Sequence, residues 1–129
     1  MNRAEIIEKM KSFDFEKSEY IISTGAAMVL HGVREQTHDI DLGCTKALCD
    51  KLIALGCDYI VYPDGGRKIS FSEDIEVSEF LYGGRAVTLC GLPVADLDTI
   101  TATKRRLGRE KDFRDIALIE QFRAERETK

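Results

Sequence analysis

Residues 20–43, YIISTGAAMVLHGVREQTHDIDLG, place two strands and a short helix in quick succession and put two aspartates in the second strand. The apolar and β-branched run Tyr20–Thr24 predicts a strand that stops at Gly25, after which AAMVLHG predicts the helix. In the predicted strand HDIDLGC, the side chains of Asp39 and Asp41 leave the same face, about 6.5–7 Å apart. Two like charges at this spacing destabilise a strand unless a cation lies between them.

The composition indicates an ordinary globular domain. Of the 129 residues, 43% are hydrophobic and 33% are charged, with two prolines, so disorder is not expected. The formal net charge of −4 argues neither for a general nucleic-acid coat nor for a membrane surface. The four cysteines have no CxxC spacing, so we expect neither a zinc site nor a disulfide framework. Without a signal-peptide pattern or a membrane-length apolar run, we expect a single cytoplasmic domain over residues 1–129.

The rest of the chain predicts an α+β fold. A first helix begins with a capping box of Asn2 and Glu5, and Thr45 caps a later helix. Alternating residues predict further strands in YIVY, KISFS, DIEVSEF and RAVTLCGLPV, with PDGG as the turn between the first two. Two helices, 98–107 and 110–124, end the chain. This order predicts a mixed sheet of five or six strands with helices packed on it.

The two aspartates have the spacing of a metal site. Such side chains can converge on two cations about 3.5–4 Å apart, the arrangement used for in-line displacement at phosphorus. Magnesium suits the site because it takes oxygen ligands and keeps several waters. A third carboxylate is expected from SEDIEVSEF, where Asp74 and Glu76 share a face. Glu76 ranks first because it lies mid-strand between two β-branched residues, where an unpaired charge is costly, and Asp74 ranks second.

The turn between the first strand and the short helix is a candidate anion site. Ser23, Thr24 and Gly25 lie where backbone N–H groups and the helix dipole favour a phosphate. The two hydroxyl groups can also donate to phosphate oxygens. Each motif alone has an ordinary explanation, because Asp-x-Asp triplets are frequent by chance and Ser-Thr-Gly can simply cap a helix. The combination of the two is more specific.

Together these motifs resemble the nucleotidyltransferase superfamily to which DNA polymerase β belongs. Its pattern is a strand–turn–helix with a small Gly/Ser motif, followed by an Asp-x-Asp/Glu strand flanked by apolar residues. A finer pattern resembles the minimal bacterial nucleotidyltransferases and AbiEii-type toxins, and is matched here by Gly25, Ala26, His31, Gly32, Arg34, Thr37, Asp39, Ile40 and Asp41. The C-terminal KRRLGREKDFRDI also resembles a K…R.KD..D segment of those relatives.

The resemblance implies transfer of a nucleoside monophosphate from an NTP such as ATP to an acceptor hydroxyl, with release of pyrophosphate. It implies that Asp39, Asp41 and Glu76 are the catalytic and metal-binding set, holding two Mg²⁺ ions or Mn²⁺. The nucleotide-binding residues that it implies are Ser23, Thr24, Gly25, Arg34, Lys104 and Lys111. Minimal relatives suggest a small helical partner protein of a toxin–antitoxin pair as acceptor, AbiEii-type relatives suggest tRNA, and a homo-oligomer is a further way to complete the site.

Two alternatives stay open at the level of sequence. Lys104 and Lys111 lie among acidic residues and are also explained as solvated ion pairs on a helix surface. The family's first motif glycine is Thr24 here, and a β-branched residue narrows the space for a triphosphate. This substitution motivates a second hypothesis, a non-catalytic module that keeps the fold and binds a nucleotide or a protein. The presence of Asp39 and Asp41 favours the enzyme.

Overall fold

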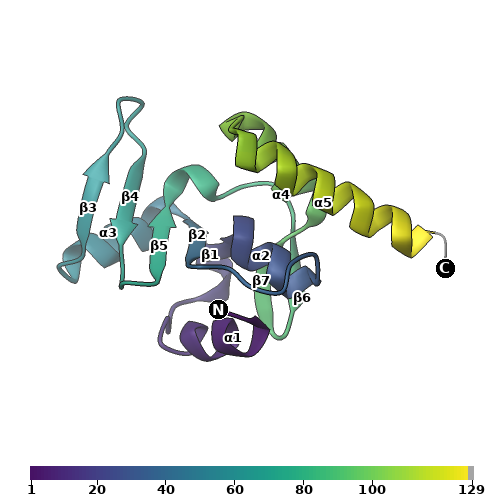
Figure 1. The fold of residues 1–129 in the computed structure, drawn as a ribbon. Helices are drawn as coiled ribbons and strands as arrows, with labels where there is room; N and C mark the ends of the chain where they lie inside the picture. Colours follow the sequence, from purple (N-terminus) through teal and green to yellow (C-terminus); the bar gives the residue numbers. More distant parts are fainter. Residues whose placement is uncertain (128–129) are drawn as a thin grey trace.

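The computed structural model describes residues 1–127, in which α-helices surround one mixed sheet (Figure 1). The helices are α1 (Arg3–Met10), α2 (Thr24–His31), α3 (Lys46–Ala54), α4 (Leu97–Leu107) and α5 (Glu110–Glu127). The strands are β1 (Tyr20–Ser23), β2 (Ile40–Cys44), β3 (Asp58–Val61), β4 (Arg67–Ser70), β5 (Ile75–Ser78), β6 (Ala86–Leu89) and β7 (Leu92–Ala95). Two short 3₁₀ turns, η1 (Lys17–Glu19) and η2 (Glu79–Leu81), join these elements.

The sheet has seven strands in the order β3-β4-β5-β2-β1-β7-β6, where the sequence predicted five or six. β1 pairs antiparallel with β2 and parallel with β7, and β2 pairs parallel with β5. The additional strand arises because RAVTLCGLPV folds back on itself at Cys90 and Gly91, whose φ angles are +53° and +75°. Two consecutive residues with positive φ make a tight hairpin turn, so this segment forms β6 and β7.

The two faces of the central strands have opposite chemistry. Ile22, Leu42 and Val77 lie in register across β1, β2 and β5 and are fully buried in the core. Successive residues of a strand alternate between faces, so Asp41 and Glu76 point to the other side. These two residues are register partners on parallel strands. The fold therefore places two carboxylates next to each other on the face of the sheet opposite the core.

The helices begin and end largely where the sequence predicted. The capping box of α1 is confirmed, because Asn2 and Glu5 each accept a hydrogen bond from the other's backbone N–H. Thr45 caps α3 by accepting from the backbone N–H of Leu48. The C-terminal α5 reaches Glu127, past the predicted end at 124. Within the described residues, no helix combines the length and apolar character needed to cross a lipid bilayer.

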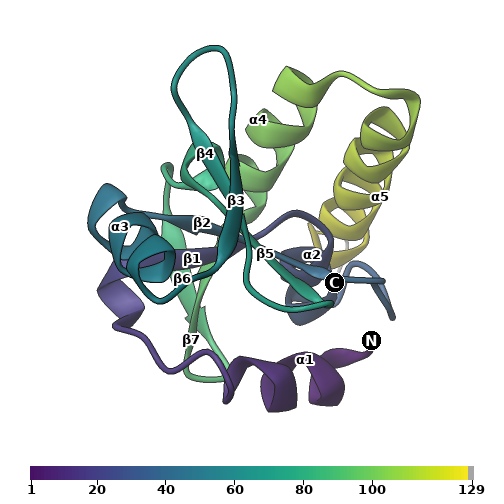
Figure 2. The ribbon, with the colours of Figure 1, turned by 90° about the vertical axis from the view of Figure 1, so that its left-hand side faces the viewer.

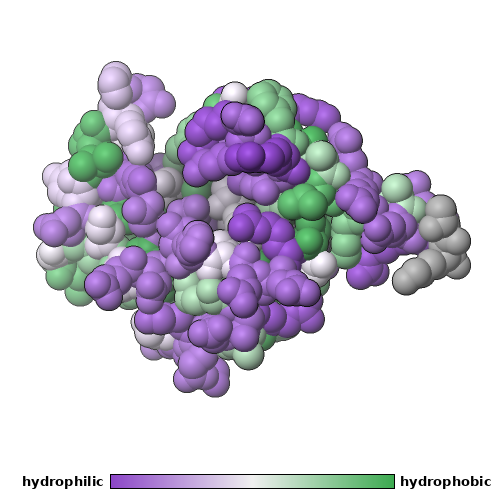
Figure 3. Space-filling model, in the orientation of Figure 1, coloured by the Kyte–Doolittle hydropathy of each residue, from purple (hydrophilic) through white to green (hydrophobic). Residues whose placement is uncertain are grey.

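The C-terminal helices lie on the side of the molecule that carries the acidic face. α4 packs on α2, and α5 packs along α4. Turned by 90°, the ribbon shows the β3–β4 hairpin projecting on one side and α4 with α5 on the other (Figure 2). The surface is correspondingly notched between the hairpin and these helices (Figure 3). The acidic ends of β2 and β5 line the cleft between these two projections.

Candidate functional site

A cleft of about 800 Å³ brings most of the predicted site residues together. Its lining includes the acids Asp39, Asp41 and Glu76, the turn residues Thr24 and Gly25, and the cations Arg34, Lys104 and Lys111. Ser23 does not line the cleft, because it is only 1% exposed at the end of β1 beneath the turn. Asp74 also lies elsewhere, paired with Lys9 of α1 at 2.7 Å. Of the two candidates for the third carboxylate, the cleft contains Glu76.

Asp41 lies at the most electrostatically crowded point of the cleft. Burial raises the pKa of its carboxyl group, and the negative charges of Asp39 and, less strongly, Glu76 raise it further. A hydrogen bond from the Thr24 hydroxyl to Asp41 Oδ2, at 2.9 Å, acts in the opposite direction. A carboxylate that is costly to ionise beside two others is stabilised by a bound cation. The donor chemistry of Asp39 and Asp41 therefore fits a hard divalent metal such as Mg²⁺.

Glu76 is engaged with a residue that the sequence analysis did not single out. Its Oε2 lies 3.0 Å from Nζ of Lys68 on β4, and this contact is the main cause that raises the pKa of Lys68. Among residues 1–127, no three His, Cys, Asp or Glu side chains are grouped closely enough to hold a metal. Asp39 and Asp41 are thus the pair that fits a metal, and Glu76 joins them only if it leaves Lys68. The alternation of KISFS already places the Lys68 side chain on the same face of the sheet as the acids. Which acid it pairs with depends on the order of the strands in the sheet, which the alternation does not give.

Thr24, the first residue of α2, has a backbone conformation that favours glycine. Its φ angle is +48°, which is unusual for any residue with a side chain and especially for a β-branched one. The following Gly25 has no room for a side chain, because an added Cβ would meet the Thr37 hydroxyl at 2.6 Å. The nucleotidyltransferase pattern that the sequence resembles has a glycine at this position, and a φ of +48° is one that glycine adopts without strain. Strain of this kind is concentrated at functional sites.

At position 24, glycine is expected to give a more stable protein than alanine, which is the reverse of their order inside an ordinary helix. Thr24→Gly and Thr24→Ala both remove the hydroxyl and the β-branch, but only glycine adopts a φ of +48° without strain. The Gly variant should unfold with a free energy about 1 kcal/mol higher than the Ala variant. Urea denaturation measures the difference. Ala27→Gly, a buried position in the middle of α2, is the control and should lower stability. A Thr24→Ala variant as stable as Thr24→Gly would contradict the strained geometry.

The opposite wall of the cleft is formed by the corner between α4 and α5, where charges are paired rather than solvated. Lys104 is only 5% exposed, and its Nζ lies 2.8 Å from Asp115 and 3.4 Å from Asp112. Arg109 Nε donates to Asp112 at 2.7 Å. Arg34 lies 3.8 Å from Asp115. Lys104 is therefore buried in an ion cluster, in contrast to the exposed surface pairs that its sequence context also allowed.

The corner between α4 and α5 also contributes cations to the lining of the cleft. Asp112 and, to a smaller degree, Asp41 and Asp115 raise the pKa of Arg109. Arg109, Lys111 and Arg114 all line the cleft from the α4–α5 corner. A cleft with carboxylates on one side and a group of cations on the other suits a metal-bound polyphosphate. Asp112 and Asp115 were visible in the sequence only as part of the resemblance, with no role of their own.

Asp112 should make stability depend on pH below about 4. Burial opposes its ionisation, but hydrogen bonds from Arg109 and the charge of Lys104 outweigh burial and lower its pKa from 3.8 to about 2. A carboxyl group with a lower pKa in the native state than in the unfolded state stabilises the fold at any pH above its unfolded-state pKa. This stabilisation is lost as the pH falls through the native-state pKa. We expect about 2 kcal/mol to disappear between pH 4 and pH 2. Urea midpoints across this range measure it, and Asp112→Asn should flatten that part of the profile.

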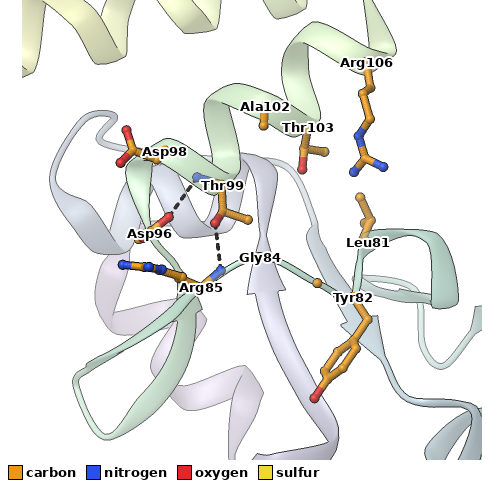
Figure 4. A pocket seen from close by; sticks show the side chains of 11 residues that line it. Leu81, Tyr82, Gly84, Arg85, Asp96, Asp98, Thr99, Ala102, Thr103 and Arg106 are labelled. Carbon is orange, nitrogen blue, oxygen red and sulfur yellow. Dashed lines mark hydrogen bonds between the residues drawn. The ribbon is translucent and has the colours of Figure 1, made fainter.

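A second, smaller cavity of about 410 Å³ lies next to the cleft and shares Leu81 with it. Figure 4 shows its α4 side, where Thr99, Thr103 and Arg106 face the chain segment that leads from η2 to β6. The backbone N–H of Arg85 donates to the Thr99 hydroxyl at 2.9 Å, and Asp96 accepts from the Thr99 backbone at 2.8 Å. These bonds join the segment after η2 to the first turn of α4. One side of the smaller cavity is therefore held by hydrogen bonds between the segment and the helix.

Comparison with known proteins identifies the class of fold. No family model matches the chain, and no curated protein matches it in sequence. Among solved structures, it is similar to the lincosamide antibiotic adenylyltransferase LnuA in its lincomycin-bound form, with a TM-score of 0.50 and 14% sequence identity. The similarity covers 90% of this chain and 92% of that chain. At this identity the likeness concerns the fold alone, and the chain has the nucleotidyltransferase fold that its sequence predicted.

Proposed function

We propose that the protein is a metal-dependent nucleotidyltransferase that moves a nucleoside monophosphate from an NTP to an acceptor hydroxyl. The observation that carries this proposal is the composition of the cleft. Asp39 and Asp41 lie beside the turn at Thr24 and Gly25, opposite the cations of the α4–α5 corner. The nucleotidyltransferase fold of the neighbour, itself an adenylyltransferase, supports the same reaction class. We further assign the protein to the AbiEii-type or minimal branch and to the cytoplasm, on its sequence motifs.

In the proposed reaction, the acceptor oxygen attacks the α-phosphorus, the bond to the bridging oxygen breaks, and pyrophosphate leaves with the electron pair. Bound Mg²⁺ or Mn²⁺ would lower the pKa of the acceptor hydroxyl and neutralise the phosphates. Asp39 and Asp41 would hold the metal, and the proton of the acceptor hydroxyl leaves to water in the open cleft. Gly25 allows close approach of a phosphate at the start of α2. Arg109 and Lys111 stabilise the charge that develops on pyrophosphate.

The candidates for the acceptor hydroxyl belong to a protein, an RNA or a small molecule. The sequence motifs favour a small helical partner protein of a toxin–antitoxin pair, or tRNA, with a second copy of the chain as another way to complete the site. The solved neighbour acts on a lincosamide antibiotic, which adds a small hydroxylated molecule to these candidates. The net charge of −4 favours a protein or a small molecule over RNA, although the cations of the α4–α5 corner provide a local basic face.

A transfer assay tests the proposed reaction. The protein is incubated with each α-³²P-labelled NTP, Mg²⁺ or Mn²⁺, and acceptors of each class: tRNA, co-expressed partner protein and hydroxylated antibiotics. Covalent label on one acceptor, together with release of pyrophosphate, is the expected result. Absence of label from every acceptor, with no pyrophosphate released, would count against an enzyme.

A second candidate function is a non-catalytic module that keeps the fold and binds a nucleotide or a protein. It is favoured by two internal contacts, Thr24 with Asp41 and Lys68 with Glu76, which satisfy two carboxylates without a metal. Calorimetric titration with Mn²⁺ and ATP separates the two hypotheses. If Asp39→Ala leaves both affinities unchanged, the module is the better description. A measured transfer that Asp39→Ala abolishes would exclude it.

A further inference from the structure

An exposed aromatic ring lies beside the acidic face without any role in the core. Phe80, at the centre of η2, is 42% exposed and lines the cleft that contains Asp41 and Glu76. It follows β5 directly, so it is four residues from Glu76 along the chain. An exposed phenylalanine leaves a large apolar surface in water. A ring in this position calls for an explanation other than packing.

The backbone on both sides of Phe80 is rigidly held. Glu79 accepts from Arg67 through Nε at 2.8 Å, through Nη2 at 3.2 Å and through the backbone N–H at 3.0 Å. Leu81 lies so close to β2 that a side chain at Gly43 would overlap the Leu81 carbonyl and the Tyr82 nitrogen. With both neighbours fixed, the chain presents Phe80 on a rigid support, as a binding residue requires.

Arg106 stacks on the Phe80 ring. The guanidinium carbon of Arg106 lies 4.7 Å from the ring centroid, in a cation–π contact. Arg106 lines the neighbouring cavity rather than the cleft, and it extends from α4 toward η2 in Figure 4. Phe80 itself lines the cleft and stays 42% exposed, so the ring lies where the two cavities meet, with Arg106 as its support.

A second aromatic ring lines the cleft. Tyr62 follows β3 and is 41% exposed. Its backbone N–H donates to the Gly66 carbonyl across the hairpin turn. Two exposed rings, one from the hairpin and one from η2, therefore line the cleft together with the cations of the α4–α5 corner.

We propose that Phe80, supported by Arg106, is the stacking subsite for the base of the nucleotide, an inference that rests on the proposed function. The two kinds of side chain in the cleft suit different parts of a nucleotide. The cations of the α4–α5 corner suit the phosphates, and the rings suit the planar, apolar base. Stacking does not read the hydrogen-bonding edge of a base, so the subsite accepts several bases and favours the larger purines. Tyr62 flanks the same base from the hairpin.

The test compares ligands with and without a base. Isothermal titration with Mg²⁺ present measures the affinities of ATP and of inorganic tripolyphosphate for the wild-type chain and for Phe80→Ala. Without the Phe80 ring, the affinity for ATP should fall about tenfold or more, because the base loses its stacking partner. The affinity for tripolyphosphate should stay the same. Phe80→Trp should retain ATP binding. Tyr82→Ala is the matched control, because Tyr82 is 43% exposed, two residues away, and lines the smaller cavity instead.

Each other outcome overturns the subsite in a distinct way. An unchanged ATP affinity for Phe80→Ala with a raised KM for a ring-bearing acceptor would assign the ring to the acceptor. Equal weakening of ATP and tripolyphosphate would show a general structural effect. If the wild-type chain binds ATP no more tightly than tripolyphosphate, the base subsite is contradicted but the phosphate site is not. If it binds neither ligand, the proposed function fails as well.

Discussion

Asp41→Asn should lower nucleotidyl transfer on the order of a thousandfold without unfolding the protein, as loss of a central electrostatic group does in other enzymes. The side chain keeps its size, but it loses the charge that would hold the metal between Asp41 and Asp39. Because burial and neighbouring charges raise the pKa of Asp41, removing its charge relieves repulsion. We therefore expect thermal stability to be unchanged or higher, the combination typical of a functional residue.

Asp74→Asn is the matched control for Asp41→Asn. It is the same substitution just before β5, but Asp74 pairs with Lys9 outside the cleft. Its transfer rate should stay within about twofold of wild type, as for a surface ion pair. Initial rates with labelled NTP and thermal unfolding curves are measured for both variants. An Asp41→Asn protein with more than a tenth of the wild-type rate would contradict the role assigned to Asp41.

Asp112→Ala should lower the free energy of unfolding by about 3 kcal/mol, because it leaves buried charges without their partner. Asp112 is fully buried and contacts both Lys104 and Arg109. Without it, Lys104 keeps only Asp115, and the corner between α4 and α5 loses the bonds that close it. A loss of this size is a large part of the stability of a small domain. Urea denaturation monitored by circular dichroism gives the value.

Asp98→Ala tests whether burial is the cause of the Asp112 effect. Asp98 also pairs with an arginine, Arg123 at 2.8 Å, but its side chain is 83% exposed. A solvated pair of this kind contributes less than about 0.5 kcal/mol. Similar losses for Asp98→Ala and Asp112→Ala would show that the Lys104 cluster is not a buried network.

Much of the fold was predictable because its signals are local. The capping box at Asn2, the hairpin after Tyr62 and the acidic strand each depend on residues close in sequence. The seventh strand was missed because it needs Cys90 to adopt a positive φ, which its residue type does not indicate. Local patterns predict elements well where the residue type itself restricts the backbone, and poorly where a non-glycine residue is forced into a turn.

The site was harder to predict because its contacts join distant segments. The pairing of Lys68 with Glu76 depends on β4 lying next to β5, which the order of elements does not settle. The burial of Lys104 depends on α5 folding back along α4, although its neighbours in sequence are charged. Asp41 and Glu76 were accessible to sequence reasoning because alternation along β2 and β5 places both on the face opposite the core. Asp39 was predicted in the same strand as Asp41, but it lies just before β2, which begins at Ile40.

The contact between Gly43 and Leu81 joins two parts of the site that appear separate in the sequence. β2 carries Asp41, η2 carries Phe80, and the absence of a side chain at Gly43 lets their backbones touch. A shift of either segment is therefore transmitted directly to the other, so substitutions on the two sides should combine non-additively. In homologues of this chain, position 43 is therefore expected to tolerate glycine alone.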